Sequence, residues 1–190
     1  MIKVQLLLAS IRSKLGDTNA ENFYYANTEI VEAINGALRD ISQNALCFFK
    51  VWHIQSKKEV KRYKLPDDFI LFSKKHPDDV DNKLIAYMDS QTFFVKTEPK
   101  LKDERYPVWS FYYNYNERIY EIDDTLYILD GFFEPIVYHA LSTLCMSPNR
   151  ENGLSQSEFF RAKYSESLRL PLHHARKVTS NIKQTKHRRV

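Results

Sequence analysis

The chain has 190 residues, a net charge of +4 and a hydrophobic fraction of 43%. These values suit one domain with a real core and exclude a scaffold that depends on disulfides. The two cysteines, Cys47 and Cys145, lie in apolar stretches without metal-ligand spacing, so we expect buried free thiols and folding in a reducing cytosol. Because no signal peptide opens the chain and no segment reaches the ~20 apolar residues of a membrane helix, we expect a soluble protein, made in the cytoplasm of a host cell.

The positive charge is concentrated at the C-terminus. Residues 176–190 contain no acid. They carry six basic residues: Arg176, Lys177, Lys183, Lys186, Arg188 and Arg189. Removing these six charges from the total of +4 leaves −2 for residues 1–175. A basic end of this kind is typical of an interaction arm, and hydrophobic content is low beyond Pro171. We therefore expect residues 171–190 to form a basic arm that a partner orders.

Apolar residues recur at helical spacing in four segments. The first segment ends at Gly16, a good C-terminal stop, and the second begins at a predicted N-cap, Thr28. Ser155 and Glu158 form a capping-box pattern for the fourth helix, which Pro171 interrupts or ends. The predicted helices cover about residues 3–15, 28–45, 134–146 and 155–170.

The period changes to that of strands between the second and third helices. Aromatic and β-branched residues predict short strands, and Asp89 caps either a short helix through Val95 or a turn. The expected strands are 48–57, 60–65, 70–72, 84–87, 109–115, 118–122 and 125–129. The predicted fold is mainly α: a bundle of about four helices, a small antiparallel β meander inserted between the second and third helices, and an extended C-terminal arm. In domain terms, 1–170 is one domain with an insert at about 48–129, and 171–190 is the arm.

The sequence contains no phosphate-binding loop, nucleophile elbow or zinc-protease motif. We therefore expect no enzymatic activity, no cofactor and no metal site. The acidic pairs 67–68, 78–79 and 123–124 lie at predicted turns, where Asp bonds to its own backbone. His173 and His174 are the only pair of adjacent histidines in the sequence. Neighbours on a helix point to different sides, so these two side chains rarely ligate one ion together. His139 lies near an apolar helix face.

Two N-terminal segments resemble phage head–tail adaptor proteins. Members of that family open with a helix that ends in an Arg-x-x-Leu-Gly-Asp-like turn. An aromatic residue, a Ser/Thr cap and an acidic residue follow, and lead into a helix with an Ile/Leu-Asn-x-Ala-x-Arg-Asp-Ile pattern. The residues that carry the resemblance are Arg12, Leu15, Gly16 and Asp17 in the turn, Tyr25, Thr28 and Glu29 in the cap region, and Ile34, Asn35, Ala37, Arg39, Asp40 and Ile41 in the helix.

Two further segments resemble the family, and two depart from it. Residues 63–69, Tyr-Lys-Leu-Pro-Asp-Asp-Phe, are similar to its step into the insert. Residues 134–146 are similar to its apolar penultimate helix. The long Tyr-rich insert and the residues beyond Pro171 lie outside the family pattern.

The resemblance implies a structural virion protein at the head–tail junction. It implies a homo-oligomeric ring of about twelve copies between the portal protein and the tail or nozzle proteins. Genomic DNA would pass through this ring when the viral genome is ejected. Family members dock on the portal through their C-terminal segment, so the basic arm would face the portal or the DNA.

Other classes of protein remain open from the residues alone. A nucleic-acid-binding protein could use the basic tail, but it also needs a basic folded surface, which a body of charge −2 does not supply. The 12 Tyr, 12 Phe and 2 Trp lie mostly in the β segments, away from the tail, which argues against a stacking platform for single strands. Another tail-completion protein of similar size is a second alternative. An enzyme with a site assembled from scattered residues is a third, although no residue nominates one.

Overall fold

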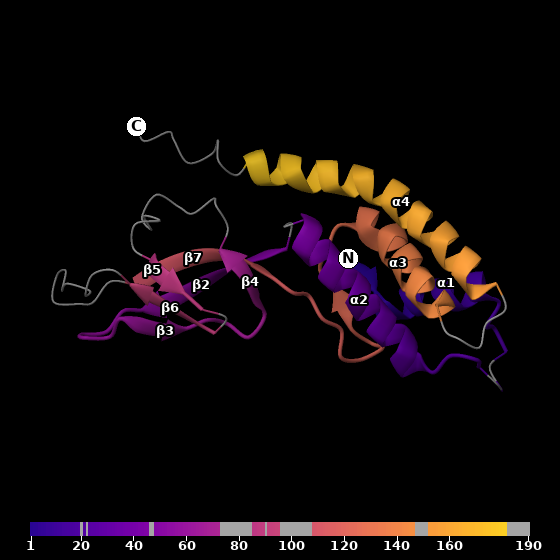
Figure 1. Cartoon of the computed structure of the whole chain (residues 1–190), viewed down its shortest axis with the longest axis horizontal. Helices are drawn as coiled ribbons and strands as arrows, with labels where there is room; N and C mark the ends of the chain where they lie inside the picture. The colour runs from indigo at the N-terminus through magenta and orange to yellow at the C-terminus, as the bar shows by residue number, and fades with distance from the viewer. Residues whose placement is uncertain are drawn as a thin grey trace. The chain divides into compact units, whose positions relative to one another are not determined.

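A computed structural model of the chain (Figure 1) describes residues 1–19, 21, 23–45, 48–72, 85–89, 91–95, 108–146 and 152–181. The chain divides into two compact units, and its fold as a whole contains both helices and antiparallel sheets. The helical unit consists of Met1–Cys47 and Glu117–Val190, and the β unit consists of Phe48–Asn116. Residues 117–129, which the predicted insert included, therefore belong to the helical unit. Among the described helices, none combines the length and apolar character needed to cross a membrane.

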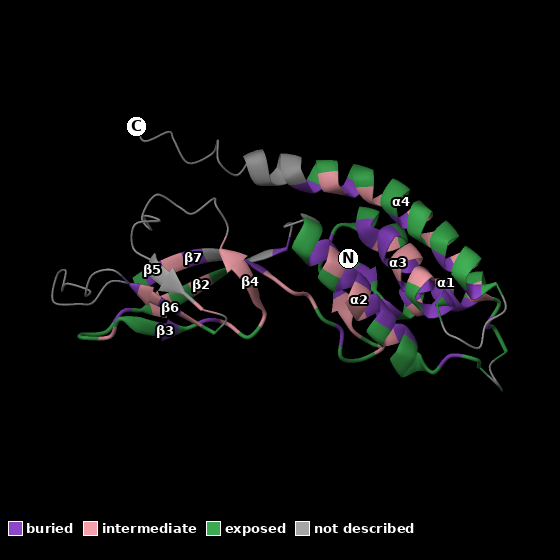
Figure 2. Cartoon of the chain, in the orientation of Figure 1, coloured by how far each residue is buried: buried purple, intermediate pink, exposed green. Residues whose placement is uncertain are grey.

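The helical unit is built around a central helix, α3, which packs against α1, α2 and α4. The buried faces of these helices turn toward one another (Figure 2). The predicted apolar faces are confirmed at Ile30, Ile34 and Leu38 and at Ile136 and Leu141, all fully buried. The elements of this unit are β1 (Ile2–Lys3), α1 (Val4–Leu15), α2 (Asn27–Ala45), β8 (Thr125–Leu126), η1 (Asp130–Phe132), α3 (Phe133–Cys145) and α4 (Gly153–Asn181).

A two-stranded sheet and a glycine define the ends of α1. β1 pairs with β8 in antiparallel register, Ile2 opposite Leu126, a contact that the sequence analysis did not predict. At the other end Gly16 has a φ of 72° and its N–H reaches the carbonyl of Ser13 at 3.2 Å. A residue with a Cβ is strained at such a φ, so the predicted stop at Gly16 is confirmed.

The start of α2 differs from the prediction. The helix begins at Asn27, so Thr28 lies inside the first turn and is not the N-cap. The N–H of Ala26 donates to the Glu29 carboxylate at 2.7 Å, which is the backward half of a capping box. The helix start is thus stabilised by the Glu29 side chain, which bonds back to the residue before the helix, and not by the predicted Thr28 cap.

The fourth helix also differs from the prediction at both ends. α4 begins at Gly153, so Ser155 lies within the helix rather than capping it, and the helix continues through Pro171 to Asn181. A proline in a helix interior costs about 3 kcal/mol. Here its side chain is buried beside η1, where a Cβ on Gly131 would lie 3.4 Å from its ring, and we infer that this packing compensates for the lost hydrogen bond. The predicted extended arm is therefore wrong for 171–181, and residues 182–190 lie outside the described ones.

The β unit contains two three-stranded antiparallel sheets, with strand orders β2-β7-β4 and β3-β6-β5. Antiparallel strands were predicted correctly, but the meander was wrong because strands distant in sequence pair with each other. β7 lies between β2 and β4, while the predicted strand at 118–122 is not formed. Of the two alternatives at Asp89, the turn is correct, because its carboxylate accepts the N–H groups of Gln91 and Thr92, and the residues through Val95 form a strand. The bounds are β2 (Phe49–Gln55), β3 (Arg62–Lys64), β4 (Phe69–Phe72), β5 (Ile85–Met88), β6 (Thr92–Val95) and β7 (Val108–Tyr115).

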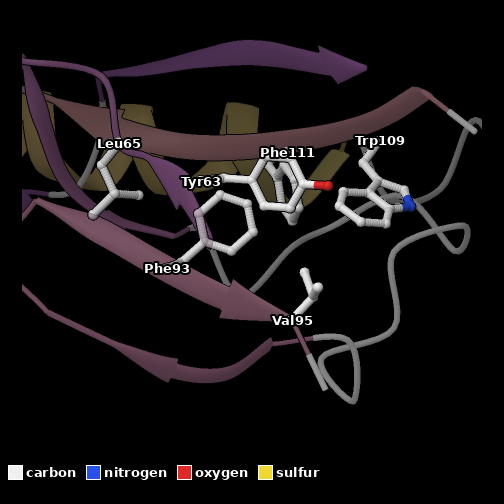
Figure 3. Packing of buried hydrophobic residues seen from close by; sticks show 6 residues of the cluster. All are labelled: Tyr63, Leu65, Phe93, Val95, Trp109 and Phe111. Atoms are coloured by element: carbon white, nitrogen blue, oxygen red, sulfur yellow. The ribbon is translucent and has the colours of Figure 1, made fainter. Parts of the chain in front are cut away.

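An aromatic core joins the faces of these two sheets. Its buried residues are Tyr63, Leu65, Phe93, Val95, Trp109 and Phe111 (Figure 3). Phe93 has no exposed surface, and its ring centroid lies 5.3 Å from that of Phe111 and 5.7 Å from that of Trp52. Edge-to-face packing at such distances adds to the free energy gained by burial. These aromatic residues therefore form the core of the unit.

Candidate functional site

The turn residues that carry the family resemblance form a buried ion pair. Arg12 Nη1 donates to Asp17 Oδ2 at 2.5 Å, and both residues are less than a tenth exposed. Arg12 Nη2 donates to the carbonyl of Tyr25 at 2.9 Å and to Asn27 Oδ1 at 2.7 Å. Gly16 makes the close approach possible, because its left-handed backbone turns the chain back onto α1.

Asp17 fixes the loop that leads into α2. Its carboxylate accepts the backbone N–H groups of Tyr24 at 2.7 Å and Tyr25 at 3.3 Å. The Arg12 guanidinium lies 3.7 Å from the centroid of the Phe23 ring, and the Tyr25 hydroxyl donates to the carbonyl of Leu144 on α3 at 2.9 Å. The loop is thereby fastened to α1, α2 and α3 at once. We call Arg12, Asp17, Tyr25 and Asn27 the arginine node.

Asn27 is the member of this node that the sequence analysis missed. A polar residue directly before a predicted cap was the available signal, but asparagine is common at any helix start. Only the fold brings it to an arginine fifteen positions earlier.

The helix part of the motif makes two further joints. The side-chain amide of Asn35 donates to the carbonyl of Ile119 at 2.9 Å and accepts its N–H at 2.7 Å. Asn35 therefore satisfies both backbone groups of a residue predicted to lie in a strand. Asp40 accepts a hydrogen bond from the Tyr164 hydroxyl of α4. Burial is the larger cause that raises the pKa of Tyr164, and this hydrogen bond is the second. Ile34, Ala37 and Ile41 are buried, whereas Arg39 is exposed.

His139 lies in the same contact region between helices. Its ring meets Tyr164 edge-on at 5.0 Å, and its Nδ1, closed from solvent, has no hydrogen-bond partner among the described residues. Burial lowers the pKa of His139, the Asp40 charge opposes that shift, and Arg161 adds to it. The imidazole is therefore a neutral residue of the helix interface.

The predicted bonding of acidic pairs to their own turn backbone is found at Asp124, whereas the carboxylate of Asp68 bonds to side chains of two strands. Asp68 accepts hydrogen bonds from Lys50 and Tyr113 at 2.9 Å each. Asp124 accepts two backbone N–H groups, which lower its pKa. The pair 78–79 lies outside the described residues. Within the described part of the chain, no three His, Cys, Asp or Glu side chains come close enough to hold a metal ion.

The remaining predicted residues are two exposed histidines, a buried cysteine and residues outside the described side chains. His173 and His174 are exposed, with ring centroids 6.3 Å apart. Cys145 is a buried thiol, as predicted, and its Sγ lies 3.8 Å from Oε1 of Gln156, while Cys47 lies outside the described residues. Positions 176 and 177 belong to α4, and Lys183, Lys186, Arg188 and Arg189 are not described. The basic arm therefore stays a prediction.

An open groove lies between α1 and the start of α4. Its volume is about 370 Å³, and its lining includes Lys14, Ser155, Gln156, Phe159 and Phe160. Phe159 is 57% exposed. Lys14 lies 5.3 Å from the ring centroid of Tyr138, on which Phe160 stacks. We call this feature the α1–α4 groove. Its described lining joins aromatic surface to one positive charge, an arrangement suited to bind a protein side chain.

No protein-family model matches this chain, and no curated protein matches it significantly.

Proposed function

We propose that the chain is a structural subunit of a tailed-phage virion, a head–tail adaptor that forms a ring between the portal and the tail. In this reading the helical unit is the adaptor bundle, the β unit is its insert, and the basic residues from Arg176 onward, at the end of α4 and beyond it, face the portal. DNA passes through the ring, and the protein performs no catalysis.

One observation carries the proposal. Four of the residues that match the family's turn and helix patterns, Arg12, Asp17, Asn35 and Asp40, fasten segments of the helical unit together. Arg12 and Asp17 hold the loop before α2, and Asn35 holds the segment after β7. A pattern matched by chance need not place its polar residues at such joints. A pattern that describes a fold is expected at such joints, because buried polar groups require their partners.

The distribution of charge and apolar surface also favours an assembly subunit. Residues 1–175 carry a net charge of −2, so copies can approach one another with little mutual repulsion. Several large hydrophobic side chains are exposed, among them Tyr24 after α1 and Leu154 and Phe159 at the start of α4. Exposed side chains of this kind are available for protein contacts.

The test is a mixture of the purified chain with the portal protein of the same phage, imaged by electron microscopy. We expect a ring of this chain stacked on the portal. Deleting residues 182–190 should weaken the complex without lowering the stability of the helical unit. Absence of any complex, together with DNA affinity that falls steeply with salt, would refute the adaptor and favour a nucleic-acid-binding protein.

A further inference from the structure

A tight acidic turn presents an exposed tyrosine on the helical unit. The Asp124 carboxylate accepts the N–H of Tyr120 at 2.9 Å and that of Glu121 at 3.0 Å. The Tyr120 side chain is nevertheless 78% exposed, with the Arg118 guanidinium 5.5 Å from its ring centroid. Glu121 and Asp123 beside it are exposed as well. We call residues 120–124 the tyrosine turn.

The turn is held in a defined shape before it meets any partner. The same two backbone hydrogen bonds lower the pKa of Asp124, so its carboxylate stays charged and bonded at neutral pH. The Asp123 carboxylate accepts from the Gln5 side chain at 2.5 Å, and Asn35 fixes the preceding residue, Ile119. A preorganised side chain loses little entropy on binding, and exposed tyrosines of this kind often carry binding energy.

The tyrosine turn and the α1–α4 groove lie at opposite ends of one helix. The N–H of Val4, the first residue of α1, donates to the carbonyl of Asp124 at 3.1 Å. Lys14, in the last turn of α1, lines the groove. The helix has 12 residues, so about 18 Å separate its ends. A chain therefore cannot place its own turn in its own groove, but a second copy can.

We propose that the tyrosine turn of one copy docks in the α1–α4 groove of the next. The Tyr120 ring lies against Phe159, and its hydroxyl bonds to the polar side chains of the groove, Ser155 and Gln156. The groove volume of about 370 Å³ is at the lower end of the range of protein pockets and accepts one aromatic side chain. The carboxylates of Glu121 and Asp123 face Lys14, the charged residue of the described groove lining.

Charge complementarity selects a second copy as the occupant. Residues 118–124 carry three acids and one base, Arg118, a net charge of −2, while the groove presents a lysine beside the positive N-terminal end of α4. The contact is heterologous, so successive copies continue in one direction and close into a ring when the rotation divides the circle. The inference rests on the proposed function only for that closure.

Cross-linking between copies tests the contact directly. Glu121→Cys chains are mixed with Ser155→Cys chains and treated with a short bis-maleimide, and the unsubstituted chain reports the background from its own cysteines. We expect a cross-linked pair of the two variants. The matched control replaces Ser155→Cys with Leu170→Cys, also exposed on α4 but about 22 Å further along the helix. No cross-link, or an equal one with the control, would overturn the proposal.

Self-association measured by sedimentation provides the second readout. Tyr120→Ala should weaken it at least tenfold, as expected for an interface anchor, and Lys14→Glu about fivefold. Tyr127→Ala removes an equally exposed tyrosine outside the turn and should change nothing. The proposal is contradicted if Tyr120→Ala weakens self-association no more than Tyr127→Ala does. Portal-bound rings without the cross-link would refute the proposed interface and support the adaptor function. The cross-link without portal binding would support the interface and refute the adaptor function.

Discussion

The substitution Asp17→Asn tests whether the arginine node holds the helical unit together. It keeps the size of the side chain and removes its charge. The Arg12 guanidinium is then left buried without a counter-ion, although it keeps its bonds to Tyr25 and Asn27. Asp17 also loses strength as an acceptor for the N–H groups of Tyr24 and Tyr25, because charged acceptors bind more strongly.

The expected cost follows from the burial of the pair. The side chains of Arg12 and Asp17 are 7% and 6% exposed, so solvent cannot replace the lost partner. Breaking such a buried pair costs about 3–5 kcal/mol. A domain of this size has about 5–15 kcal/mol of stability, so the substitution should remove a large share of it.

The chain contains separate probes for its two units. Both tryptophans, Trp52 and Trp109, lie in the β unit, while the described α-helices all lie in the helical unit. Circular dichroism at the helix wavelength therefore follows the helical unit during urea unfolding, and tryptophan fluorescence follows the β unit. Asp17→Asn should move the first transition to lower urea and lower the free energy of unfolding by about 3–5 kcal/mol.

Two outcomes would refute this reasoning. A loss below about 1 kcal/mol would mean that the pair is not buried as described, and a shift of the fluorescence transition alone would place the effect in the wrong unit. The matched control is Arg39→Ala, which removes an exposed arginine of the same motif. It should change stability by no more than about 0.5 kcal/mol.

Three further predictions concern other parts of the fold. The pKa of His139 is lowered from 6.5 in the folded chain, so the unfolded chain binds the proton more readily. The contribution of neutral His139 to the free energy of unfolding is therefore complete above pH 6.5 and is lost as the pH falls from 6.5 through the folded pKa. Urea unfolding at a series of pH values should show this loss, and His139→Leu should reduce it; an unchanged slope contradicts the prediction. Phe93→Ala should cost the β unit about 3–5 kcal/mol, seen as an earlier fluorescence transition, and an unmoved midpoint would show that the aromatic core adapts to the cavity. Gly16→Ala should cost about 1 kcal/mol from its φ of 72° alone, since no atom lies near the new Cβ; a neutral effect in dichroism-monitored unfolding would mean that the helix end rearranges.

The helices were predictable because their signals are local. The apolar period of α2 and α3 and the left-handed stop at Gly16 depend only on neighbours along the chain, and the structure has them there. The same holds for the antiparallel character of the strands, which follows from short apolar segments separated by turns. The buried thiol of Cys145 was likewise readable from its apolar neighbours.

Long-range contacts decided the features that were predicted wrongly or missed. Pro171 remains helical because it packs beside Gly131, and 118–122 is not a strand because Asn35 takes the backbone hydrogen bonds of Ile119. The pairing of β7 with both β2 and β4 was invisible for the same reason: each partner offers similar aromatic and β-branched residues, so only packing chooses between them.

The amino-acid sequence by itself determined the helical periods, the end of α1, the uneven charge and the residues that resemble an adaptor. Only the tertiary structure decided what those residues do: Arg12 is neutralised by an aspartate across a turn, and Asn35 closes a segment 84 positions away. It also decided that Lys14 and Phe159 share one groove while Tyr120 stands at the other end of α1. The physical reason is that burial and electrostatic contact depend on distance in space, which the order of residues along a chain does not contain.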